Sequence, residues 1–186
     1  MITIVSGLPR SGTSLMMQMV EAGGISALTD GVREADENNS RGYYEFEPVK
    51  KLRADASWVP QAEGKVVKVI AQLLQHLPQG HDYRVVFMDR DLTEVLRSQT
   101  TMLKNLGQKT PALPAAILAR TFDQQVAKTK AWAAAQPNVE LLTIGHRAAI
   151  ERPASIAAEV NAFLGGTLDE TAMAGVVDPS LYRARG

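Results

Sequence analysis

The sequence predicts a three-layer α/β fold, in which a central parallel sheet of about 4–5 strands is flanked by helices. Three observations predict it. Short β-branched runs alternate along the chain with segments of helical periodicity, the first run ends in a glycine-rich turn, and the hydrophobic share of 45% is that of a globular protein. Residues 1–186 are expected to form a single domain, because a chain of this length buries one core comfortably and two only poorly.

The first half of the chain is predicted to open with a strand, a loop and a helix. Residues 2–6 are β-branched, and residues 13–21 carry apolar side chains at helical spacing. Gly23 and Gly24 are expected to end this helix. The later elements are a short strand over 25–28, a polar loop over 29–42, a short helix over 48–55, a buried strand over 65–70 and a brief helix over 71–77.

The second half continues the alternation. Residues 84–89 give the clearest strand, and Asp91 with Glu94 forms a capping-box pattern that opens the next helix. Three elements complete the prediction: an Ala-rich helix over 115–135, a last strand over 139–144, and a helix that opens at Arg152-Pro153 and stops at Gly165-Gly166. Because ligands of such a sheet bind at the carboxyl ends of its strands, the site is expected there.

Charge and composition restrict the partners. Twenty basic and twenty acidic residues give a formal net charge of zero, so no overall field attracts a nucleic acid or a membrane. Cysteine is absent, which excludes disulfides, thiolate metal sites and a Cys nucleophile and favours a cytoplasmic location. No apolar run approaches the ~20 residues needed to span a bilayer, and the apolar start is too short for a signal peptide.

The glycine-rich turn is the strongest candidate site. A loop between a first strand and a first helix directs backbone N–H groups and the positive helix end at one point, where an anion binds. The spacing from Gly7 to Gly12 has the frame of a nucleotide-binding P-loop, but Thr13 stands where an ATPase or kinase has lysine. Arg10 supplies a cation instead, with a planar fork for phosphate oxygens. The alternative is a turn that only connects strand to helix.

Three motifs resemble those of the sulfotransferase family. The first resembles its 5′-phosphosulfate loop and comprises Pro9, Arg10, Ser11, Gly12, Thr13 and Ser14. The second is the spacing of Arg90 and Ser98, which is similar to the family's arginine and serine for the nucleotide 3′-phosphate. The third, residues 144–165 with Phe163-Leu164-Gly165, resembles the family's last strand and helix. Arg90 alone also fits an ordinary strand-end residue that pairs with Asp89 or Asp91.

This resemblance implies a P-loop fold and an activity. The donor would be the adenine nucleotide 3′-phosphoadenosine 5′-phosphosulfate (PAPS), a co-substrate, and the reaction would be in-line transfer of a sulfuryl group to an unidentified hydroxyl or amine acceptor. Arg10 and the amides of residues 11–14 would stabilise the charge that develops on the departing phosphate. The scheme requires no metal.

The general base is where the chain departs from the family. Cytosolic members carry Lys-Thr-His after the second core strand, whereas this chain has Lys68-Val69-Ile70, in which Lys68 can still stabilise the transferred group. Other branches use a glutamate after the first helix, which makes Asp30 and then Glu34 the candidate bases here. Glu45 and Glu47 are in reserve, and a solvated acidic loop is the alternative. His76 is interpreted as a surface histidine.

Two other functions compete. The loop frame, together with Asp89 at a strand end where it could hold magnesium, also fits a nucleotide kinase or NTPase. The absent histidine fits a nucleotide-binding module without catalysis. The chain also lacks the family's C-terminal Arg-Lys-Gly motif for the 3′-phosphate, and Arg183 and Arg185 could substitute for it.

Overall fold

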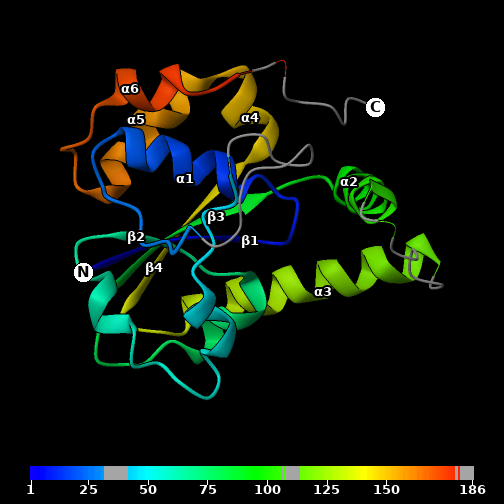
Figure 1. The fold of residues 1–186 in the computed structure, drawn as a ribbon, viewed down its shortest axis with the longest axis horizontal. Helices are drawn as coiled ribbons and strands as arrows, with labels where there is room; N and C mark the ends of the chain where they lie inside the picture. Colours follow the sequence, from blue (N-terminus) through cyan, green and yellow to red (C-terminus); the bar gives the residue numbers. More distant parts are fainter. Residues whose placement is uncertain (32–41, 106, 108–113, 179, 181–186) are drawn as a thin grey trace.

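A four-stranded parallel sheet forms the centre of the computed structural model, which describes residues 1–31, 42–105, 107, 114–178 and 180. The strands lie in the order β2-β1-β3-β4 (Figure 1). Their bounds are Ile2–Gly7 for β1, Val66–Lys68 for β2, Tyr83–Asp89 for β3 and Val139–Gly145 for β4. The expected parallel sheet is confirmed, and its four carboxyl ends share one edge.

Helices cover both faces of this sheet, which gives the three layers that the sequence predicts (Figure 1). One face packs against α1 (Thr13–Ala22), α4 (His146–Glu151), α5 (Pro153–Leu164) and α6 (Glu170–Gly175). The other packs against α3 (Ala115–Ala134) and the 3₁₀ helices η1 (Glu47–Lys51), η2 (Val59–Ala62) and η3 (Ala71–His76). The remaining helix, α2 (Leu92–Asn105), follows β3 and lies beside α3.

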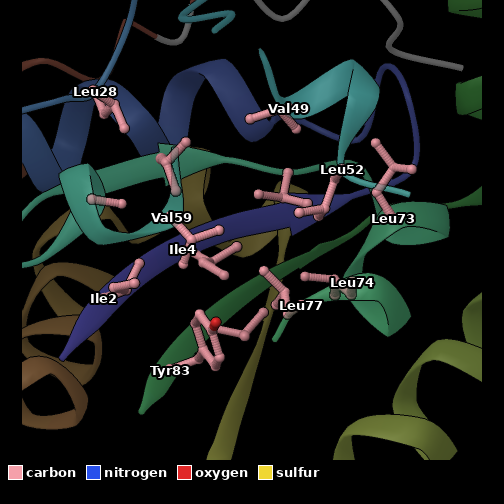
Figure 2. Packing of buried hydrophobic residues seen from close by; sticks show 14 of the residues in the cluster. Ile2, Ile4, Leu28, Val49, Leu52, Val59, Leu73, Leu74, Leu77 and Tyr83 are labelled. Carbon is pink, nitrogen blue, oxygen red and sulfur yellow. The ribbon is translucent and has the colours of Figure 1, made fainter. Parts of the chain in front are cut away.

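The alternation of side chains along β1 divides the core between the two layers. All six residues of β1 are buried, as expected for an inner strand. Ile2 and Ile4 point toward η2, η3 and Tyr83 (Figure 2), whereas Val5 points toward α1 and α5. Each such fully buried side chain contributes about 2 kcal/mol through the hydrophobic effect. The sheet is therefore anchored from both sides immediately before the glycine-rich loop.

Some elements differ from the prediction. Residues 25–28 do not form a strand and make only an isolated bridge, Ala27 to Val66, beside the three-residue strand β2. The helix expected over 48–55 is the short 3₁₀ helix η1, and that over 71–77 is the 3₁₀ helix η3. The sequence analysis did not predict α4 and α6, which have six residues each and too few periods to be recognised. None of the described helices has both the length and the apolar character needed to cross a membrane.

Asn161 connects α5 to the segment that leads into α6. Its side chain is buried, donates to the Glu170 carboxylate at 2.7 Å and accepts from the Leu168 amide at 2.8 Å. We expect Asn161→Ala to lower the free energy of unfolding by about 2 kcal/mol, because two hydrogen bonds of a buried side chain are lost and the partly buried Leu168 amide loses its acceptor. Urea denaturation measures the change, and Glu159→Ala, at an exposed position of the same helix, is the control. Equal stability of the two variants would contradict this role.

Candidate functional site

The loop that joins β1 to α1 is shaped by three positive φ angles. Gly7 has a φ of 151°, Arg10 of 71° and Gly12 of 98°. A Cβ atom on Gly7 would lie 2.4 Å from the Ser11 hydroxyl oxygen and 2.7 Å from the carbonyl oxygen of Met88. No side chain fits there, so glycine is required by close approach as well as by φ. The loop lies at the carboxyl edge of the sheet, where ligands of parallel sheets bind.

The start of α1 offers the loop's polar groups. Gly12 is the N-cap residue in a left-handed conformation and supplies no capping side chain. The amide of Ser11 donates to the carbonyl of Leu8 at 3.1 Å, whereas an α-helix provides no carbonyl of its own to its first amides. The Ser11 hydroxyl is buried and has no hydrogen-bond partner among the described residues. Gly12, Thr13 and Ser14 are partly exposed, so an anion can reach this helix end.

Two arginines and a serine, far apart in the sequence, meet at this loop. Arg10 Nε donates to Ser98 Oγ at 3.0 Å, which connects the loop to α2. Arg90 Nη1 donates to the backbone carbonyl of Arg10 at 3.0 Å, which connects the loop to the end of β3. The structure therefore brings together Arg10, Arg90 and Ser98, and it does so beside the N-terminus of α1. Pro9, at the tip of the same loop, is exposed.

Glu94 balances the charge of Arg90. Arg90 Nε donates to Glu94 Oε2 at 2.9 Å, and the arginine side chain is only 9% exposed. Asp91 caps α2 as expected, since its Oδ1 accepts from the amides of Thr93 at 2.9 Å and Glu94 at 3.2 Å. The Glu94 side chain binds Arg90 across one helical turn instead of completing the capping box. The carboxylate that pairs with Arg90 is thus that of Glu94, and not that of Asp89 or Asp91 as in the alternative interpretation of Arg90 as an ordinary strand-end residue.

Asp89 forms an ion pair with the opposite layer. Its Oδ2 lies 2.8 Å from Lys130 Nζ of α3, and that ammonium lies 5.5 Å from the centre of the Phe87 ring. The carboxylate at the end of β3 is thus engaged by a cation. In the part of the chain that the structure describes, no three histidine or acidic side chains are grouped closely enough to hold a metal ion.

His146 is a site residue that the sequence analysis missed. It follows β4 directly, its side chain is nine-tenths buried, and its ring packs on Gly12, where an added Cβ would lie 2.3 Å from His146 Cδ2. Burial, with Arg90 as a second cause, lowers the pKa of His146 to about 4, and Glu94 acts in the opposite direction. The available signal was a polar residue two positions after the last predicted strand, near the edge where parallel strands end together.

Lys68 lies at the end of β2 under a strained segment. Its Nζ donates to the backbone carbonyl of Tyr43 and lies 6.0 Å from the centre of the Tyr43 ring. Tyr44 follows with a φ of 53°, and its hydroxyl donates to Glu21 at 2.8 Å. Burial, with this carboxylate as a second cause, raises the pKa of Tyr44 to about 12. Residues 42–46 therefore contact both α1, through Glu21, and the end of β2, through Lys68. Ile70, two positions after Lys68, is exposed.

The acidic candidates are dispersed. Asp30 is exposed, and its carboxylate accepts from the amide of Glu47 at 2.6 Å, at the start of η1. Glu45 and Glu47 both form ion pairs with Lys50. Glu34 lies outside the described residues, as do Arg183 and Arg185. The role of Asp30 and Glu34 as bases stays a prediction.

Solved structures of sulfotransferases are similar to this chain. A sulfotransferase domain from the curacin biosynthetic pathway aligns with a TM-score of 0.56 and 12% identity, over 92% of this chain and 76% of that one. A sulfotransferase domain from the Synechococcus PCC 7002 olefin synthase aligns with a TM-score of 0.56 and 15% identity, over 97% of this chain and 85% of that one. Retinol dehydratase in complex with androsterone and inactive cofactor PAP aligns with a TM-score of 0.52 and 16% identity, over 92% of this chain and 61% of that one.

These likenesses show that the chain has the fold of sulfotransferases, which confirms the fold expected from the three motifs. No protein-family model matches the sequence. No curated protein matches it either.

Gly7 gives a direct test of the loop geometry. We expect Gly7→Ala to destabilise the protein by about 3 kcal/mol, because the new methyl group meets a backbone carbonyl and the φ angle is strained for alanine. Thermal and urea denaturation measure the loss. Gly80→Ala is the matched control, since nothing lies within 4 Å of a Cβ atom at Gly80. If Gly7→Ala were as stable as this control, the close approach at the loop would be wrong.

Proposed function

We propose that this chain is a sulfotransferase that moves a sulfuryl group from PAPS to a hydroxyl or amine acceptor. The observation that carries the proposal is the convergence of Arg10, Arg90 and Ser98 beside the N-terminus of α1. The sulfotransferase fold supports it, as does the neighbouring structure described in complex with PAP.

The phosphates of the donor would divide between the two ends of this cluster. The 5′-phosphosulfate fits the loop of residues 8–14, where helix amides and the partial positive charge of α1 attract an anion. The 3′-phosphate fits Arg90 and Ser98, because a guanidinium and a hydroxyl together offer several donors to one phosphate. The buried Ser11 hydroxyl, which has no partner among the described residues, supplies a further donor within the loop.

Both arginines would exchange partners when the nucleotide binds. Arg10 now contacts Ser98, and Arg90 contacts Glu94. A phosphate dianion carries more charge than either partner, so charge-assisted hydrogen bonds to it are the stronger choice. The present contacts keep both guanidinium groups close to the loop before the nucleotide arrives, which reduces the conformational entropy that binding removes.

In the transfer step, the bond between sulfur and the bridging phosphate oxygen breaks as the acceptor oxygen or nitrogen bonds to sulfur. The electron pair of the broken bond stays on that phosphate oxygen, where Arg10 and the loop amides stabilise it. The acceptor gives its proton to a base, for which Asp30 and Glu34 are the candidates. Lys68, held at the sheet edge by Tyr43, stabilises the sulfuryl oxygens.

A nucleotide-binding module without catalysis is the second candidate. It is favoured by the engagement of Asp30, whose carboxylate caps η1 and is therefore occupied as a hydrogen-bond acceptor. The kinase or NTPase alternative has less support, since Thr13 replaces the usual lysine and Asp89 pairs with Lys130.

Nucleotide preference separates these functions. We expect calorimetry without metal to show tighter binding of 3′,5′-bisphosphoadenosine than of ATP. Arg10→Ala and Arg90→Ala should each weaken the bisphosphate complex by more than about tenfold, or 1.4 kcal/mol, because each removes a charged donor. Arg53→Ala, an exposed arginine near η1, is the control. Tight binding of ATP that depends on magnesium would instead favour a kinase or NTPase.

Turnover of the donor separates the enzyme from the binding module. With PAPS and a panel of hydroxyl and amine acceptors, we expect release of the bisphosphate by the wild type and a loss of at least about tenfold in kcat for Lys68→Ala, since one charge that stabilises the transition state is removed. Asp30→Asn and Glu34→Gln test the two bases. Lys65→Ala, just before β2, is the matched control. Tight bisphosphate binding without turnover on any acceptor would favour the module.

A further inference from the structure

His146 is the buried ionisable group at the carboxyl edge that the proposed mechanism does not use. Its ring packs edge-on against Gly12, so that an added Cβ there would lie 2.3 Å from Cδ2 and 3.2 Å from Nε2. Gly12 is also the N-cap residue of α1, with a φ of 98°. The imidazole therefore lies next to Gly12 at the start of α1, although His146 and Gly12 are far apart in the sequence.

The charges that face His146 come from two other elements. Arg90, at the end of β3, disfavours the imidazolium, and Glu94, on α2, favours it. On its own helix, Arg147 and Glu151 form an exposed pair with each other, and Glu159 of the adjoining α5 is exposed. The first turn of α1 carries no ionisable carboxyl or amino side chain, but its amides add a partial positive charge.

This local balance keeps the ring neutral in the free protein. Burial is the largest cause, and together with Arg90 it lowers the pKa of His146 to about 4. At neutral pH a neutral imidazole packs against Gly12 without repelling Arg90 or the helix end. A positively charged ring at this position would be unfavourable, because burial and the charge of Arg90 both disfavour the imidazolium.

We propose that His146 is a positioning residue of the phosphate loop, which supports Gly12 as a neutral ring and takes up a proton when an anion binds at the loop. The proposal rests on the proposed function, because it assumes that the loop at Gly12 is an anion site. The proposal adds to that function a residue, His146, that neither the motifs nor the proposed transfer step includes.

The physical basis is the change of charge at the loop. An anion bound by the amides of α1 and by Arg90 neutralises the two positive groups that disfavour the imidazolium. It also adds negative charge close to the ring, so the pKa of His146 rises on binding. Because the pKa of His146 is depressed in the free protein and higher in the bound protein, anion binding takes up a proton. The affinity for the anion therefore increases as the pH falls through the pKa of the bound state.

The test measures the affinity for 3′,5′-bisphosphoadenosine between pH 8 and pH 5.5. Wild type is compared with His146→Gln and with His146→Phe, which retains a ring but cannot bind a proton. The ratio of wild-type to variant affinity cancels the titration of the phosphates themselves. We expect this ratio to rise by at least about fivefold as the pH falls, within the limit of tenfold per pH unit for one proton. His81→Gln, a histidine paired with Glu63, is the matched control.

NMR titration of the three histidines gives a second measurement on the wild type alone. We expect the midpoint of His146 to rise by at least about two pH units when the bisphosphate or inorganic pyrophosphate is added, because a fivefold change in the affinity ratio down to pH 5.5 requires a bound midpoint of about 6. The midpoint of His81 should stay unchanged. This measurement decides the inference even where the variants fold poorly.

The outcomes separate the two proposals. If the wild type does not bind the bisphosphate, the proposed function fails, and the pyrophosphate titration alone decides the role of His146. An affinity ratio that is flat with pH, or an unchanged His146 midpoint with bound anion, would overturn the inference while leaving nucleotide binding intact. A His146 midpoint that rises with either anion supports it.

Discussion

The hydrogen bond from Arg90 to the backbone carbonyl of Arg10 connects the parts of the site, because it joins the loop to the end of the neighbouring strand. Arg10 has a φ of 71°, a conformation that costs a non-glycine residue about 1–3 kcal/mol unless the surroundings fix it. The bond to Arg90 and the contact of its own side chain with Ser98 hold Arg10 from both sides. These two contacts add to the pairing of Gly7 with Met88, which holds the start of the loop against β3.

A chain with no net charge gathers positive charge at the candidate site. The formal charge is zero, yet two guanidinium groups and the N-terminus of α1 converge on one loop. Glu94 offsets part of this charge, and the neutral state of His146 avoids adding more. A nearby carboxylate reduces the repulsion between positive groups before a ligand binds, and it stays exchangeable because Glu94 is partly exposed.

The other side of the sheet edge has a different character. Residues 42–46 precede η1 and contact α1 and β2. Tyr44, which has a positive φ angle, donates a hydrogen bond to Glu21, and the Tyr43 carbonyl accepts one from Lys68. The exposed Ile70 follows Lys68 where a histidine would give a general base. This side therefore offers one cation and an apolar side chain, and in the proposed transfer the proton acceptor would come from another segment.

The sequence by itself determined the order of the main strands and helices along the chain and the position of the glycine-rich loop. These features are local: hydrophobic periodicity shows the buried strands, and the residues from Gly7 to Ser14 are contiguous. The strand predicted over residues 25–28 is wrong, because pairing with a neighbouring strand is a tertiary contact and these residues make only one bridge to Val66.

Only the tertiary structure decided the partners of the site residues. Arg90 pairs with Glu94 and not with Asp89 or Asp91, Asp30 caps η1, and His146 packs on Gly12 across 134 positions of the chain. These contacts depend on where parallel strands end and on which side chains are closest there. Sequence spacing shows which residues follow a strand, whereas the order of the strands in the sheet decides which of these residues meet.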